Sequence, residues 1–293
     1  MKIASLLPSA TEILFAIGAG GDVVGVTHEC DYPPGAATLP KLTWSSTPES
    51  DAPREIDRHV RAALHAGSSL YGLDAERLER LAPDLIVTQE LCAVCAVSFG
   101  IVARAVRRLQ SDPRVVSLEP RSLADVFATI AFLGEITGYR DGAAAALSDL
   151  ERRVDLLRRQ SGLRAARPTT LVLEWTDPPM SAGHWIPELI EIAGGSPVLA
   201  NPGGDSQRLE WPAIAAADPE CVIVAPCGFD LPRTQRAIAA LDKVPEWLAL
   251  RACRERRVLA LDGNAYLSRP GPRLVDAAEI ATRWYTSGAE YAG

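Results

Sequence analysis

The chain has 293 residues, of which 47% are hydrophobic and 23% charged, the composition of a folded globular protein. Its length exceeds one ordinary domain and fits two lobes of about 130 residues each. The net charge of −7 and the lack of a long basic run argue against nucleic acids and anionic membrane surfaces as partners.

The N-terminal sequence bears on the cellular compartment of the protein. A secretory signal needs an apolar run of about 7–15 residues before a small-residue cleavage site. Here Pro8, Ser9, Thr11 and Glu12 interrupt the only apolar run at the N-terminus. We therefore expect a cytosolic protein, or a periplasmic one if a leader has been trimmed.

Strand and helix patterns alternate along the first half. Apolar runs predict strands at residues 3–7, 23–27, 85–88 and 115–118, and helical spacing predicts helices at 11–19, 75–81 and 123–137. Ser9 is the expected N-cap of the first helix, because Glu12 follows three residues later. Residues 141–163 then form one long predicted helix near the middle of the chain.

The second half repeats this order. Strands are predicted at residues 170–174, 221–225 and 258–261, and helices at 185–193, 211–217 and 272–285. A helix, a Pro-Asp or Asp-Pro pair and a strand follow one another at 81–87 and again at 217–224. The fold class is therefore α/β, with two Rossmann-like lobes (1–138 and 167–293) that have mostly parallel sheets and are joined by a backbone helix (139–166). A ligand would lie in the crevice between them, near the carboxyl ends of the strands.

Several segments resemble one known family. They lie, in chain order, at residues 3–14, 24–27, 31–34, 39–41, 178–183, 189–195 and 262–273. Together they are similar to the helical-backbone (class III) periplasmic binding proteins, and in particular to the cobalamin-binding members. The resemblance implies a binding protein, not an enzyme, with a corrinoid as its ligand; relatives that carry haem, siderophores or metals supply the alternatives.

The resemblance also implies aromatic side chains on both faces of a corrin ring. Large flat side chains suit a flat macrocycle because they lose little entropy on binding. Packing in the core is the alternative for each of these aromatics, and it is the expected role of Trp247 and Trp284. The expected ligand-binding residues are Tyr32, Trp44, Glu90, Trp175, His184, Trp185, Trp211 and Tyr266, with His184 as an axial ligand or as an ordinary hydrogen-bonding histidine.

Relatives that feed an importer present an acidic residue on each lobe to the permease. Glu76 matches the first position, whereas Pro212 occupies the second and Glu210 is offset from it. An ABC permease is thus one expected partner, and a cytosolic binding role without one is the other.

Four residues suggest a metal site. His28 and Cys30 follow one predicted strand, and Cys92 and Cys95 follow another that we expect beside it in the sheet. Three sulfurs and one nitrogen could hold zinc, or the thiolates an iron–sulfur cluster. The alternatives are a redox-active dithiol and small buried residues under a loop.

Catalysis is the remaining hypothesis. The sequence has no Gly-rich phosphate loop in the right context and no Gly-x-Ser-x-Gly motif. Glu90, Glu174 and Asp177 lie near the expected cleft and could act as acid or base, but carboxylates are equally expected beside a polar ligand. An enzyme would turn its ligand over, whereas a binding protein would release it intact.

Overall fold

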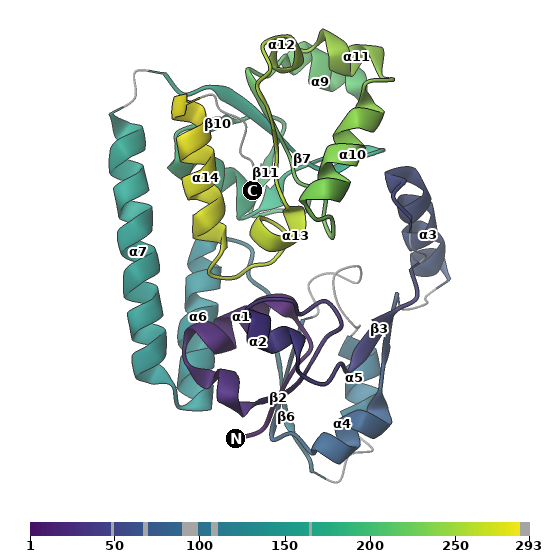
Figure 1. Cartoon of the computed structure of the whole chain (residues 1–293), viewed down its shortest axis with the longest axis vertical. Helices are drawn as coiled ribbons and strands as arrows, with labels where there is room; N and C mark the ends of the chain where they lie inside the picture. The colour runs from purple at the N-terminus through teal and green to yellow at the C-terminus, as the bar shows by residue number, and fades with distance from the viewer. Residues whose placement is uncertain (48–49, 67–69, 90–98, 107–110, 164–165, 288–293) are drawn as a thin grey trace. The chain divides into compact units, whose positions relative to one another are not determined.

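The computed structural model describes residues 1–47, 50–66, 70–89, 99–106, 111–163 and 166–287 (Figure 1). The chain divides into two units. Unit 1 comprises residues 1–49, 58–120 and 125–148, and unit 2 comprises residues 50–57, 121–124 and 149–293. Each unit contains one mostly parallel sheet, so the predicted α/β class is confirmed.

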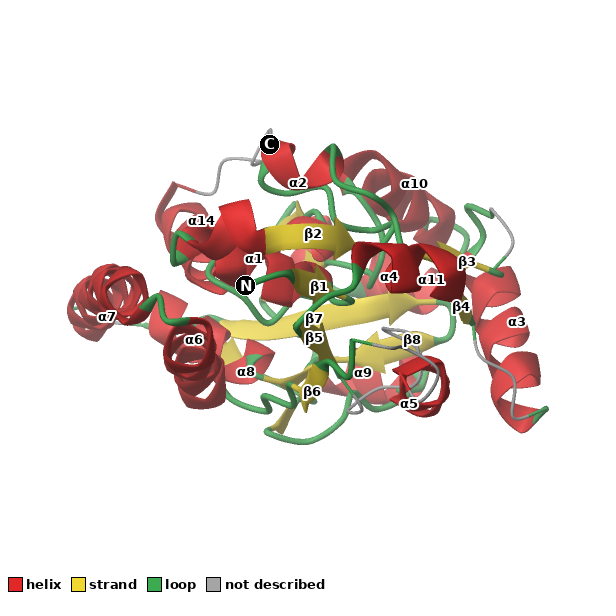
Figure 2. Cartoon of the chain, turned by 90° about the horizontal axis from the view of Figure 1, so that it is seen from below, coloured by secondary structure: helices red, strands yellow, loops and turns green. Residues whose placement is uncertain are grey.

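The sheet of unit 1 has the order β2–β1–β5–β6, with every neighbouring pair parallel (Figure 2). All residues of β1 and β5 are buried, as expected for central strands of a parallel sheet that is covered on both faces. The prediction of residues 85–88 as a strand has the observed bounds. The four strands are β1 (Ile3–Ser5), β2 (Val23–Val26), β5 (Leu85–Thr88) and β6 (Arg114–Ser117).

The first helix begins earlier than predicted. Helix α1 spans Pro8–Ala16, and its N-cap is Leu7, so the prediction that Ser9 caps it is wrong. Proline suits the first helical position because its fixed φ is helical and it has no N–H to leave unpaired. The helix also ends early, and Gly18, with φ of 88°, leads into a 3₁₀ turn, η1 (Ala19–Asp22).

The other elements of unit 1 lie around this sheet. A small antiparallel ribbon of β3 (Thr43–Ser45) and β4 (Tyr71–Leu73) was not predicted from the sequence. Helix α4 (Ala75–Leu81) has the predicted bounds, and its N-cap Asp74 accepts a hydrogen bond from the backbone N–H of Arg77 at 2.9 Å. The remaining helices are α2 (Pro34–Ala37), α3 (Pro53–His65) and α5 (Phe99–Val106).

Two long helices follow. Helix α6 (Leu123–Thr137) has the predicted bounds, and α7 (Arg140–Gly162) confirms the long helix near the middle of the chain. The two approach closely, since a Cβ placed on Gly134 would lie 2.3 Å from that of Ala143. Helix α7 begins in unit 1 and continues into unit 2.

The sheet of unit 2 has the order β10–β7–β12–β13, all parallel, with β8 antiparallel to β7. A short parallel pair, β9 and β11, lies outside it. The strands are β7 (Thr169–Thr176), β8 (Pro179–Ser181), β9 (Gly183–His184), β10 (Ser196–Pro197), β11 (Asn201–Pro202), β12 (Cys221–Val224) and β13 (Val258–Ala260).

Helices cover this sheet. Side chains of β7 and β12 pack with Ile214, Leu241 and Trp247 in one core cluster, and Trp284 is also buried, so both tryptophans predicted to be packing residues are in the core. The helices are α8 (Ile186–Ala193), α9 (Trp211–Ala217), α10 (Leu231–Leu241), α11 (Pro245–Ala249), α12 (Arg251–Arg254), α13 (Gly263–Tyr266) and α14 (Leu274–Ser287). Among the described residues, no helix has both the length and the apolar character needed to cross a membrane.

Candidate functional site

The carboxyl end of β2 is occupied by a half-buried histidine. The backbone N–H of His28 donates to Oγ1 of Thr43 at 3.1 Å, and Nδ1 lies 2.7 Å from the same oxygen. Burial, with a smaller contribution from the charge of Lys41, lowers the pKa of His28 below its ordinary value. The imidazole is therefore neutral at neutral pH.

Cys30, from the expected metal set, is buried. Its sulfur lies 3.1 Å from Oγ1 of Thr11, and its carbonyl accepts a hydrogen bond from Nζ of Lys41 at 2.7 Å. Cys92 and Cys95 lie outside the described residues. Within the part of the chain that the structure describes, no three His, Cys, Asp or Glu side chains are grouped as metal ligands. The zinc or iron–sulfur site therefore stays a prediction.

Two expected ligand-binding aromatics of unit 1 are exposed. The exposed fraction is 54% for Trp44 and 45% for Tyr32. Trp44 lies on β3, opposite Gly72 of β4. Both rings are therefore accessible to a ligand. Glu90, the third expected residue of this unit, lies outside the described residues.

The carboxyl end of β7 carries an aromatic pair. Trp175 is half-buried and meets Phe229 edge-to-face, with ring centroids 5.2 Å apart, while its Nε1 donates to the carbonyl of Asp177 at 3.1 Å. The guanidinium of Arg233 lies 4.1 Å from the centroid of the Phe229 ring. The sequence interpretation missed Phe229 and Arg233, although both follow the end of β12, where site residues are expected.

The carboxyl end of β13 leads into α13, which carries the half-buried Tyr266. Asp262 caps this helix, with its Oδ1 accepting from the backbone N–H of Ala265 at 2.6 Å. Burial raises the pKa of Asp262 above its ordinary value. An aromatic ring and a partly desolvated carboxyl group thus lie at this end of the sheet.

Two other expected ligand-binding tryptophans are packed inside unit 2. Trp185 is 6% exposed, and its Nε1 donates to the carbonyl of Leu267 at 2.9 Å. Trp211 packs against the core cluster, with its ring 6.3 Å from that of Trp247. Their sequence positions near turns did not reveal these partners, and contact with a ligand stays a prediction for both.

His184 is a special case on β9. Its φ of 49° is unusual for a residue other than glycine, and its Nε2 lies 3.3 Å from Oδ1 of Asp205. Burial lowers its pKa, and this effect exceeds the opposing influence of Asp205. The ring also lies 5.4 Å from that of Trp185. An axial-ligand role for this imidazole is untested.

The carboxylates weighed as acid or base have structural partners. Glu174 accepts hydrogen bonds from the backbone N–H of Gly183 at 3.1 Å and from the hydroxyl of Ser206. Asp177 accepts two hydrogen bonds from Arg54, at 2.9 and 3.0 Å. Both carboxylates therefore hold loops in place.

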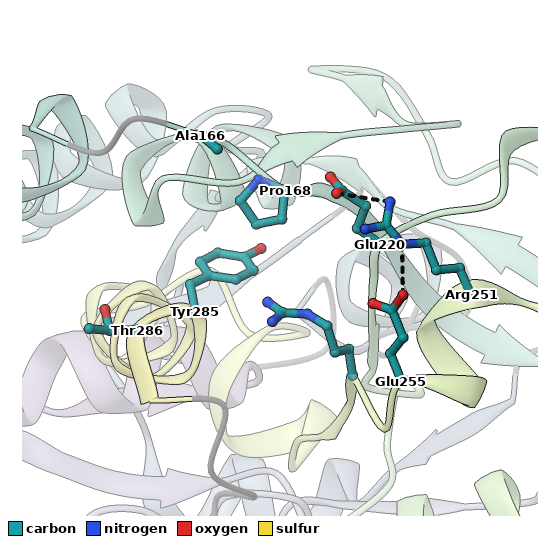
Figure 3. Close-up of a pocket in the computed structure, with 8 residues that line it drawn as sticks. Ala166, Pro168, Glu220, Arg251, Glu255, Tyr285 and Thr286 are labelled. Atoms are coloured by element: carbon teal, nitrogen blue, oxygen red, sulfur yellow. Dashed lines mark hydrogen bonds and ion pairs between the residues drawn. The ribbon is translucent and has the colours of Figure 1, made fainter.

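A cavity of about 400 Å³ lies at the amino ends of the unit 2 strands, opposite their carboxyl ends. Arg251 lies between Glu220 and Glu255, with a nitrogen 3.1 Å from each carboxylate (Figure 3). Arg257 also lines the cavity, so two arginines balance the two glutamates and the lining needs no charged ligand for neutrality. Three lining residues immediately precede neighbouring strands: Pro168, Glu220 and Arg257.

A family model described as periplasmic binding protein matches residues 3–265. The chain belongs to this family. Its membership confirms the resemblance to the helical-backbone class and makes the chain a binding protein; it lends no support to the catalytic alternative or to the expected cytosolic location.

Individual relatives are similar to this protein over nearly the whole chain. A vitamin B12-binding protein of Vibrio cholerae is 24% identical over 283 residues, which cover 95% of this chain and 86% of the relative. An ABC transporter substrate-binding lipoprotein of Bacillus subtilis is 23% identical, over 95% of this chain and 77% of the relative. The crystal structure of a periplasmic heme-binding protein from Pseudomonas aeruginosa has a TM-score of 0.74 and 22% identity, covering 98% and 93% of the two chains. This last similarity concerns the fold.

The two positions that the family resemblance predicts to be acidic differ between the units. The Glu76 side chain is 91% exposed in the first turn of α4, beside Arg80. In unit 2, Pro212 occupies the second position of α9, and the exposed Glu210 precedes that helix. Glu76 in unit 1 and Glu210 in unit 2 are therefore both exposed carboxylates near a helix start.

Proposed function

We propose that this protein binds a corrinoid of the cobalamin type and releases it unchanged. The exposed indole of Trp44 is the observation that carries the proposal. The whole-length similarity to a vitamin B12-binding protein supports the choice of a corrinoid over other ligands.

The physical reason is the chemistry of a large, flat ring. An aromatic side chain such as Trp44 gains from stacking on such a ring and removes its own apolar face from water. Tyr32 offers a second exposed ring in unit 1, and Trp175 and Tyr266 offer half-buried rings at the carboxyl ends of unit 2 strands. We propose these four side chains as ligand-binding residues; a ligand-binding role for Glu90, His184, Trp185 and Trp211 stays a prediction.

Haem is the runner-up ligand. His184 supports it, because a neutral imidazole is the form that binds iron. We place the corrinoid first because of the similarity to a vitamin B12-binding protein, since the exposed aromatic rings would stack on either macrocycle.

The proposal includes an ABC permease as partner. The exposed carboxylates of Glu76 and Glu210 are suited to ion pairs with basic residues of such a partner. The similarity to an ABC transporter lipoprotein supports this part of the proposal.

The test is a visible-absorption titration of the purified protein with cobalamin and, separately, with hemin. We expect saturable binding of cobalamin and at least about tenfold weaker binding by Trp44→Ala, which corresponds to about 1.4 kcal/mol. Phe132→Ala is the matched control, because this aromatic side chain on α6 is also exposed, at 38%. The control should bind as the unmodified protein does.

The outcomes separate the hypotheses. Saturation by hemin alone would replace the corrinoid by haem, and no response to either ligand would overturn the proposal. Mass spectrometry of the released ligand should show intact cobalamin, whereas a modified product would establish catalysis.

A further inference from the structure

A glycine lies directly opposite the exposed tryptophan of unit 1. In the antiparallel ribbon, Trp44 of β3 pairs with Gly72 of β4. A Cβ placed on Gly72 would lie 2.1 Å from both Cε2 and Cζ2 of the Trp44 indole, and 2.7 Å from its Nε1. The indole therefore covers the Cα of Gly72 and lies across the backbone of the neighbouring strand.

This arrangement depends on the missing side chain. Side chains of paired strands normally stand roughly perpendicular to the ribbon and touch their cross-strand neighbours. Any Cβ at position 72 would overlap the ring and force Trp44 away from the backbone. With Gly72 in place, one part of the indole is covered, yet 54% of the residue remains exposed.

The ribbon is tied to the main sheet of unit 1. The backbone N–H of Leu42, just before β3, donates to the carbonyl of Val26 at 2.8 Å, and that of Asp74, just after β4, donates to the carbonyl of Leu42 at 2.8 Å. The ring of Tyr71, a residue of β4, lies 5.6 Å from that of His28. The position of the indole is thus fixed relative to the carboxyl end of β2.

We propose that Gly72 is a positioning residue for ligand recognition, which holds the Trp44 indole flat so that a planar ring system can stack on its open face. The inference rests on the proposed function and deepens it, because it assigns the preference for a flat ligand to a residue that itself has no side chain. A residue with a side chain at position 72 would leave a tryptophan in the site but turn its ring.

The test compares Gly72→Ala with Gly21→Ala. Gly21 is an exposed glycine of the same unit, and a Cβ there would meet nothing within 4 Å. We expect Gly72→Ala to bind cobalamin about 3- to 10-fold more weakly, the range of one aromatic stacking contact, and Gly21→Ala to bind normally. In a Trp44→Ala background, Gly72→Ala should have no further effect on affinity.

A ligand-free measurement separates this inference from the proposed function. In protein labelled with 5-fluorotryptophan, the Trp44 resonance, assigned with Trp44→Phe, should shift in Gly72→Ala and stay unchanged in Gly21→Ala. If no planar ligand binds the unmodified protein, the proposed function and the recognition role both fail, while a shifted resonance would still show that Gly72 positions the ring.

An unchanged resonance together with unchanged affinity in Gly72→Ala would overturn the inference. If Gly72→Ala misfolds, a double variant that also carries Trp44→Ala identifies the cause. Recovery of folding in the double variant would establish the contact between positions 44 and 72. If the double variant misfolds as well, Gly72 serves the ribbon itself and the inference is wrong.

Discussion

Gly142 in the first turns of α7 provides a sharp test of the packing in unit 1. A Cβ placed on Gly142 would lie 2.0 Å from the carbonyl oxygen of Ile17 and 2.8 Å from its carbonyl carbon. Ile17 is the C-cap of α1, so the end of that helix rests directly on the backbone of α7. A carbon and a carbonyl oxygen normally approach no closer than about 3.3 Å.

The substitution Gly142→Ala therefore has two opposing effects. Alanine favours a helix over glycine by about 1 kcal/mol, but the overlap requires a shift of about 1 Å and should cost about 2–3 kcal/mol. The expected net loss is about 1–2 kcal/mol of the free energy of unfolding. Gly162→Ala in the same helix is the control, because nothing lies within 4 Å of a Cβ there, and it should gain up to about 1 kcal/mol.

Urea denaturation followed by circular dichroism measures both changes. The midpoint should fall for Gly142→Ala and stay constant or rise for Gly162→Ala, with similar slopes. If unit 1 and unit 2 unfold separately, the transition of unit 1 should move. Equal midpoints for the two variants would refute the close approach of α1 and α7.

Three further predictions concern charge and reactivity. Arg153→Ala should lower the free energy of unfolding by about 1–3 kcal/mol in denaturation experiments, because its half-buried guanidinium pairs with two carboxylates of α14. The substitution Arg152→Ala, at the exposed neighbouring position, should change the free energy of unfolding by less than about 0.5 kcal/mol. Because the pKa of His28 is lowered in the folded protein, the unfolded chain takes up a proton at this residue first as the pH falls below about 6.5. The free energy of unfolding, measured from pH 7.5 to 5, should therefore decrease with falling pH, and it should decrease more steeply than in His28→Gln. Partial burial raises the pKa of Cys253 to about 11. Peptide mapping after iodoacetamide treatment at pH 8 should therefore show faster labelling of the exposed Cys227 than of the half-buried Cys253, and equal rates would contradict the raised pKa.

The repeated segment of the two halves shows why much of the fold was predictable. In both copies the helix ends in a residue with positive φ, Ala82 at 46° and Asp218 at 36°, before a proline and a buried strand. The acidic residue next to that strand then pairs with a neighbouring strand: Asp84 accepts from the backbone N–H of Lys2, and Glu220 from that of Thr169. The local sequence contains the helix end, the turn and the strand, so pattern alone located them.

The candidate site was less predictable, because exposure depends on distant partners. Trp44 and Trp185 have similar sequence settings near turns, yet 54% of one and 6% of the other is exposed. Burial of Trp185 depends on a carbonyl 82 residues away, at Leu267. The ribbon that presents Trp44 joins two three-residue strands far apart in sequence, and segments this short have no detectable periodicity.

The two half-buried histidines bear on which macrocycle fits. Burial lowers the pKa of both His28 and His184, so both rings are neutral at neutral pH, the form that binds a metal. Nδ1 of His28 lies within hydrogen-bond distance of Oγ1 of Thr43, whereas Nε2 of His184 lies 3.3 Å from Asp205 and has no hydrogen-bond partner among the described residues. A metal that bound Nε2 of His184 would meet a nitrogen without a hydrogen bond, whereas binding through Nδ1 of His28 would break the contact with Thr43. Of the two histidines, His184 is therefore the one whose replacement by alanine should weaken the binding of hemin, if hemin binds through a metal–histidine bond.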